Sequence, residues 1–95
     1  MSMWDRARQM AEETRRRYPK GTRIELIRMG EDPRPVPPGT RGTVVYVDDM
    51  GQVGMRWDNG QSLSLIPGED SFRILTQEEV NSEKSSQSRP EQTLG

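Results

Sequence analysis

Two pairs of adjacent carboxylates are the residues whose type and spacing best suit chemistry in this chain. Asp48–Asp49 and Glu69–Asp70 could act as general acids and bases, or supply oxygen ligands to a divalent cation. Both pairs fall in segments predicted to be turns, where Asp is favoured because its side chain accepts backbone hydrogen bonds. The 95 residues include no histidine and no cysteine, so the commonest general base and all thiolate ligands are missing. We therefore expect no catalytic residue, no metal site and no cofactor.

Arginine and aromatic side chains form a second set of candidates, for binding rather than catalysis. A guanidinium group holds a carboxylate or a phosphate through two parallel hydrogen bonds, and an aromatic ring offers a stacking surface. Trp57 alternates in phase with Val53 and Met55, which favours a place in the core, and the arginines could instead pair with surface carboxylates. The candidate binding residues are Arg28, Arg34, Arg41, Tyr46, Arg56 and Trp57, and the four arginines among them could converge near a long proline-rich loop.

A dense basic cluster ends the N-terminal segment and comprises Arg15, Arg16, Arg17 and Lys20. It could contact a nucleic-acid backbone or an acidic partner, or it could be a solvated helix end, where positive charge suits the helix dipole. Residues 1–20 carry six basic and three acidic side chains, a net charge of +3, whereas residues 21–76 carry six and eight, a net charge of −2. The acidic balance of the second segment argues against a domain that binds nucleic acid non-specifically.

The segment that carries this cluster has the periodicity of a helix. Apolar and small residues recur every three or four positions over residues 3–18, and Pro19 ends the pattern. A stripe this thin can dock on the rest of the chain, pair with a second copy, or bind another protein. Beyond it the pattern changes to the alternation of a strand near Ile24 and Leu26, followed by a loop with four prolines and two glycines over residues 30–39.

Four more short segments have the composition or alternation of strands, at residues 43–47, 52–57, 61–66 and 71–75. Five short strands with a long first loop and tight later turns are typical of a small closed barrel. Residues 77–95 are too polar to bury much apolar area, so we expect them to be disordered. The predicted fold is mainly β: a helical arm over 1–19, a five-stranded SH3-like barrel over 20–76, and a disordered C-terminal tail over 77–95.

Four blocks of the sequence resemble a family of small domains from bacteria, their phages and mobile elements. The blocks are Tyr18–Met29, Pro37–Val45, Trp57–Gly60 and Leu65–Arg73. The resemblance covers residues 18–75 and implies a small all-β domain of the SH3-like kind. That family is catalogued as a domain of unknown function, so the resemblance implies no activity and no functional residue.

Together these observations predict a non-enzymatic binding module, an accessory protein of a phage or mobile element that engages a protein partner. Two alternatives stay open: a protein that sequesters a small nucleotide signal to counter host defence, and a nucleic-acid-binding accessory protein. No segment approaches the roughly 20 apolar residues of a membrane span, and the N-terminus lacks the apolar run of a secretory signal. We expect a cytoplasmic protein of a bacterial host, with residues 3–18 as a route to a homo-oligomer.

Overall fold

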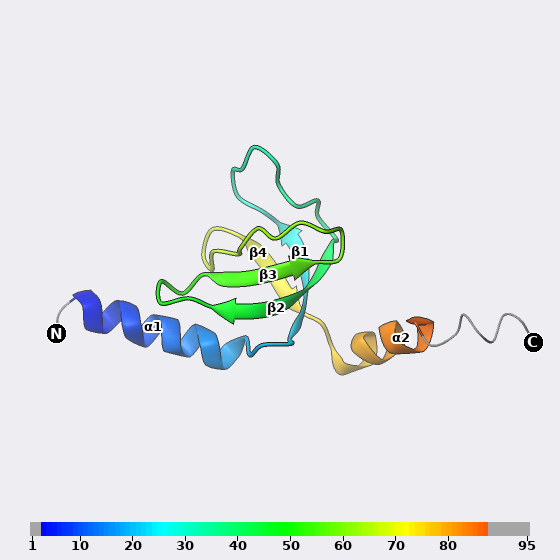
Figure 1. Ribbon diagram of the computed structural model, residues 1–95, viewed down its shortest axis with the longest axis horizontal. Coiled ribbons are helices and arrows are strands. Elements are labelled where there is room, and N and C mark those ends of the chain that lie inside the picture. Colours follow the sequence, from blue (N-terminus) through cyan, green and yellow to red (C-terminus); the bar gives the residue numbers. More distant parts are fainter. Residues whose placement is uncertain (1–2, 88–95) are drawn as a thin grey trace, which may run out of the picture.

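Four antiparallel strands form one sheet, with a helix attached at either end of the molecule (Figure 1). The computed structural model describes residues 3–87, with side chains from residue 5 to residue 85. The strand order in the sheet is β3-β2-β1-β4. The predicted N-terminal helix and mainly β architecture are thus confirmed. The elements in chain order are α1 (Met3–Arg17), β1 (Arg23–Arg28), β2 (Arg41–Val47), β3 (Val53–Trp57), β4 (Ser71–Ile74) and α2 (Gln77–Gln87).

The alternation along the strands separates a core face from an outer face. In β1, Ile24 and Leu26 are buried, whereas Arg23 and Glu25, which alternate with them, are only partly covered. Trp57 is 1% exposed, and its indole Nε1 donates to the carbonyl of Leu63 at 2.8 Å, so the ring is a satisfied part of the core. The buried core cluster is Ile24, Leu26, Val36, Val44, Val47, Val53, Met55, Trp57 and Leu65.

The expected fifth strand at residues 61–66 and the closure of the barrel are where the structure differs from the prediction. Only Leu65 pairs with β3, through an isolated bridge to Val53, and β3 and β4 lie at opposite edges of the sheet. Side chains take two of the backbone groups that a longer ladder would need. The Leu63 carbonyl accepts from Trp57, and the amide of Ile66 donates to Asp70 Oδ2 at 2.8 Å. The segment therefore packs beside the sheet without extending it.

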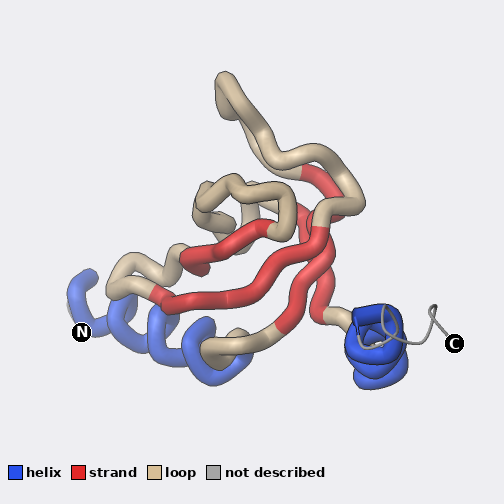
Figure 2. Tube along the Cα trace, turned by 45° about the vertical axis from the view of Figure 1, so that its right-hand side comes forward, coloured by secondary structure: helices blue, strands red, loops and turns tan. Residues whose placement is uncertain are grey.

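Helix α1 packs along β2 and the β2–β3 hairpin, as Figure 2 shows from a second direction. Ala11 is the residue that makes this possible, because its small side chain is 2% exposed and lies close to Gly51 in the hairpin turn. Arg15 adds polar contacts: its Nη2 donates to the carbonyl oxygen of Val47 at 3.0 Å and to that of Asp48 at 3.4 Å. Residues 5–10 of the helix are exposed.

Helix α2 occupies residues that the sequence predicted to be part of a disordered tail. Thr76 and Glu79 form a reciprocal cap at its start: the amide of Glu79 donates to Thr76 Oγ1 at 3.1 Å, and the amide of Thr76 donates to Glu79 Oε1 at 2.9 Å. The remainder of the predicted tail, residues 88–95, lies outside the described residues. Within residues 3–87, neither helix combines the length and apolar character that crossing a bilayer requires.

Candidate carboxylate-binding face

Charged residues on three strands line up across the outer face of the sheet. Glu25 of β1 stands opposite Arg41 of β2 on one side and opposite Arg73 of β4 on the other. One row further along, Arg23 of β1 stands opposite Thr43 of β2. Directly opposed residues of antiparallel strands project from the same side of the sheet, so three guanidinium groups gather there. We call Arg23, Arg41 and Arg73 the arginine face.

Glu25 fixes the two outer arginines from the middle of its row. Its Oε1 accepts a hydrogen bond from Arg41 Nε at 3.2 Å and another from Arg73 Nη2 at 3.1 Å. A guanidinium group has five N–H donors, so each arginine keeps donors for another anion after this contact. The strand register therefore orients N–H donors of Arg41 and Arg73 that the carboxylate of Glu25 alone cannot satisfy.

Two glutamates of α2 take up those remaining donors. Glu79 pairs with Arg73 through two hydrogen bonds, at 2.8 Å and 2.7 Å, and also lies 3.5 Å from Arg41 Nη2. Glu83 Oε2 accepts from Arg41 Nη1 at 3.2 Å and from Arg23 Nη2 at 2.7 Å. Residues four apart share one face of a helix, so the two carboxylates reach the sheet together. Arg41 lies between them and contacts both.

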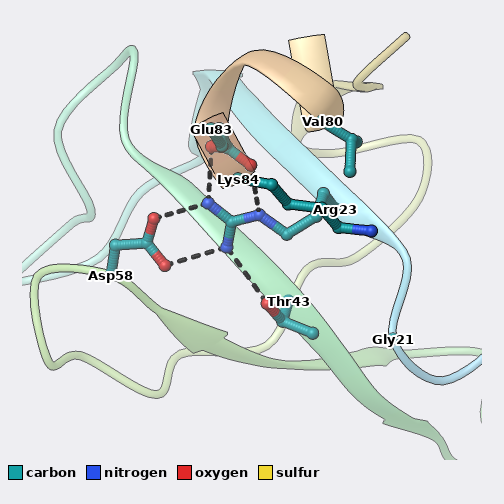
Figure 3. A pocket seen from close by; sticks show the side chains of 7 residues that line it. All are labelled: Gly21, Arg23, Thr43, Asp58, Val80, Glu83 and Lys84. Atoms are coloured by element: carbon teal, nitrogen blue, oxygen red, sulfur yellow. Dashed lines mark hydrogen bonds and ion pairs between the residues drawn. The ribbon is translucent and has the colours of Figure 1, made fainter. Parts of the chain in front are cut away.

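Arg23 is the most enclosed of the three arginines and lies beside a hollow of about 490 Å³ (Figure 3). Glu83 covers one edge of its guanidinium group, with Arg23 Nε donating to Oε1 at 3.0 Å. Asp58, which follows β3, takes the other edge through two hydrogen bonds at 2.9 Å and 2.6 Å. Thr43 Oγ1 accepts a further bond from Nη1 at 3.0 Å. The group is thus held by acids from both the sheet domain and α2.

The arginines keep the surrounding carboxylates ionised. Hydrogen bonds from Arg73, and then from the Thr76 backbone, lower the pKa of Glu79 to about 2. The hydrogen bonds of Arg23 lower the pKa of both Asp58 and Glu83 in the same way. A carboxyl group whose charged form is favoured this strongly is a poor proton donor near neutral pH. The arrangement is therefore suited to holding these carboxylates as anions in fixed positions, and these groups are poorly suited to act as general acids.

The structure brings one of the four predicted arginines, Arg41, into this face. Arg56 is exposed on the outer side of β3, opposite Thr43, and makes no ion pair within the described part of the chain. Arg28 ends β1 and Arg34 lies in the long loop; both side chains are exposed and take no part in the network around Glu79 and Glu83. The four arginines therefore do not form the single cluster that the sequence suggested.

The two predicted aromatic residues lie in different surroundings. Trp57 belongs to the core, which is the interpretation that its alternation with Val53 and Met55 favoured. Tyr46 is 55% exposed, and its ring lies across the backbone of Gly54 on the neighbouring strand. An aromatic ring over a glycine stabilises a strand pair, so this contact gives Tyr46 a structural role on the outer face.

The basic cluster at the end of α1 is divided between docking and solvent. Arg15 is directed to the backbone of the β2–β3 hairpin and lies 3.5 Å from the exposed carboxylate of Asp49. Arg16, Arg17 and Lys20 are exposed. One member of the predicted cluster thus fixes the helix, and three remain at the surface.

Sequence reasoning missed most of the residues that make up the site. Because Ile24 and Leu26 alternate with Arg23 and Glu25, the pattern of β1 places these two charged residues on the outer face, but it does not identify their partners. Arg73 and the glutamates of α2 gave no signal, because their meeting depends on the order of the strands and on a helix that composition did not predict.

Comparison with known families divides these residues into two groups. One family model, described as Domain of unknown function (DUF4314), matches residues 7–75. No curated protein matches the chain. The match contains the four strands, most of α1, the arginine face, Glu25 and Asp58, and it ends before α2. The carboxylates of Glu79 and Glu83 therefore come to the arginine face from a segment outside the matched domain.

Proposed function

The chain belongs to the family described as Domain of unknown function (DUF4314), and for this member we propose a non-enzymatic binding module that takes an acidic helix of a protein partner on its arginine face. The observation that carries the proposal is the position of Arg41 between Glu79 and Glu83. A helix with two carboxylates one turn apart already lies on this face, so the face accepts that shape and charge.

The charges around the arginine face favour a protein helix over nucleic acid. Three arginines stand beside two acids of the sheet domain, Glu25 and Asp58, and residues 21–76 are net acidic. Nucleic acid binds mainly through its continuous row of phosphates, and such a row would meet both acids. A helix brings only two carboxylates, and in the resident pair each of them hydrogen-bonds to guanidinium groups. A nucleotide phosphate in the hollow beside Arg23 would likewise face Asp58.

Two further parts of the proposal follow the sequence and the fold. Leu65 bridges to Val53 where the missing strand of an SH3-like barrel would run, which supports an open relative of that fold as the scaffold. An accessory role encoded by a phage or mobile element, in the cytoplasm of a bacterial host, follows the sequence resemblance.

The test uses a chain that ends at Thr76, which exposes the arginine face. This chain retains the core, because every buried hydrophobic residue of the described chain lies between Ala11 and Leu75. A peptide with the sequence of residues 76–87 is added to the ¹⁵N-labelled chain up to about 1 mM, the effective concentration that a short tether provides. We expect saturable shifts of backbone signals in β1, β2 and β4.

Two arginine variants make the test specific. Arg41→Gln removes the group that contacts both carboxylates. It should lower the affinity for the peptide by about tenfold, the usual loss for charged hydrogen bonds. Arg56→Gln is the matched control, since Arg56 is an exposed arginine of the same sheet face and should leave affinity unchanged. The absence of shifts at about 1 mM peptide would overturn the proposal. Tighter binding of a 12-nucleotide single strand or of free nucleotides would favour one of the two alternatives instead.

A further inference from the structure

Helix α2 is held on the sheet by charge, and its described side chains contribute nothing to the core. None of its described side chains is buried, and Val80 is only partly covered beside Arg23. Its hydrogen bonds to the sheet run from arginine side chains to Glu79 and Glu83. Such contacts form between solvent-accessible groups and contribute little each, so release of the helix leaves the domain intact.

The connection to α2 is short and anchored on the sheet side. Leu75 is 5% exposed, and its amide donates to the carbonyl of Arg23 at 3.0 Å. Thr76 follows at once and already belongs to the helix cap. A released α2 therefore stays within reach of the arginine face, at an effective concentration in the millimolar range.

The helix itself depends on being docked. It has 11 residues, among them Asn81, Ser82 and Ser85, which are weak helix formers. Isolated helices of this length are marginal in water, so release and unfolding go together. Helix α2 folds only against the arginine face and is not part of the core. Another helix could therefore replace it at this site.

From these contacts we infer that α2 is a tethered competitor for the arginine face, which a partner helix must displace with its own pair of carboxylates one turn apart. This inference rests on the proposed function and names the regulation of the same site. Two such carboxylates are separated by about 6 Å along a helix axis, and neighbouring strands by about 4.8 Å. The geometry of the resident pair therefore defines the ligand: a helix with glutamates at positions i and i+4, lying across β2, β1 and β4.

The decisive experiment compares peptide binding to three forms of the protein. The peptide of residues 76–87 is titrated into the full chain, the chain ending at Thr76, and the full chain with Glu79→Gln and Glu83→Gln together. The double variant keeps the length of the chain and the helix cap, because glutamine can replace glutamate in a capping box. We expect the full chain to bind at least about tenfold more weakly than the shortened chain, from the tether's effective concentration.

The double variant should recover most of that affinity, whereas Glu78→Gln should behave like the full chain. Glu78 is exposed on the same first turn and makes no ion pair in the described part of the chain, which makes it the matched control. Equal binding by full and shortened chains would overturn the inference while leaving the proposed function in place. Failure of the double variant to recover affinity would also overturn it, because another part of residues 77–95 would then be the obstacle. No binding by the shortened chain would refute the proposed function itself.

Discussion

Helices α1 and α2 flank the same sheet, and the contacts that hold them differ in kind. α1 buries Ala11 against the hairpin and directs Arg15 to the backbone carbonyl oxygen of Val47. α2 buries no described side chain and rests on ion pairs through Glu79 and Glu83. The first attachment combines apolar burial with bonds to neutral carbonyl groups, beside one ion pair with the exposed Asp49. The second depends on the charge of two carboxylates.

This difference means that α1 is a part of the fold, whereas α2 is bound to its surface. Apolar burial responds weakly to salt and pH, whereas exposed ion pairs are screened by salt and lost when a carboxylate is protonated. The extent of the family match agrees with the division, since it includes residues 7–17 of α1 and stops before α2. The two helices should therefore respond differently to the same perturbation, which makes each a reference for the other.

The largest effect is expected at the buried contact of α1. Ala11→Glu would force a carboxylate into the space beside the hairpin or release the helix, and should lower the free energy of unfolding by about 2 kcal/mol. Urea unfolding followed by circular dichroism measures this loss. Ending the chain at Thr76, which removes all of α2, should cost less than this single substitution, because exposed ion pairs are worth under about 1 kcal/mol each and the helix loses entropy on docking.

Gln9→Glu is the control for Ala11→Glu. Gln9 is exposed on the same helix, so it receives the same charge without burial and should change stability by less than about 0.5 kcal/mol. If Ala11→Glu proved as mild as Gln9→Glu, α1 would be as detachable as α2 and the contrast between the helices would fail.

A smaller and reversible effect is expected when pH is lowered. The pKa of Glu79 is depressed from its usual 4.5 to about 2 by Arg73 and the Thr76 backbone. A carboxylate with a depressed pKa stabilises the docked state above pH 4.5, and this contribution is lost as pH falls through about 2. The amide signals of α2 should therefore shift towards those of a free peptide over this window, before those of α1.

The side-chain carboxyl signal of Glu79 provides the direct measurement. We expect it to titrate near pH 2, and Arg73→Gln should raise the pKa towards 4.5 by removing the main cause of the shift. A Glu79 carboxyl that titrates near 4.5 in the unaltered chain would mean that the ion pair does not hold α2 in solution.

The contrast between the helices also explains what the sequence could reveal. α1 was predictable because an apolar repeat and Pro19 mark it locally, and β1 because Ile24 and Leu26 alternate with charged residues. α2 was not, because its docking is encoded in charges that look like those of a solvated tail until the strand order brings their partners together. The segment 61–66 misled for the opposite reason: its alternation is that of a strand, but side chains of Trp57 and Asp70 take the carbonyl of Leu63 and the amide of Ile66.

The smallest effect is expected at Asp58, and its direction discriminates between the two sets of contacts. Asp58 is 53% exposed and shares Arg23 with Glu83. Asp58→Asn keeps a hydrogen-bonding group but removes a negative charge, so the domain should lose less than about 0.5 kcal/mol. With one competing anion gone, Arg23 should hold Glu83 slightly more firmly, and hydrogen exchange of α2 should slow while that of α1 stays the same. Faster exchange in α2 would show instead that Asp58 positions Arg23 for Glu83. The two acids would then act together, because Asp58 orients the guanidinium group that binds Glu83.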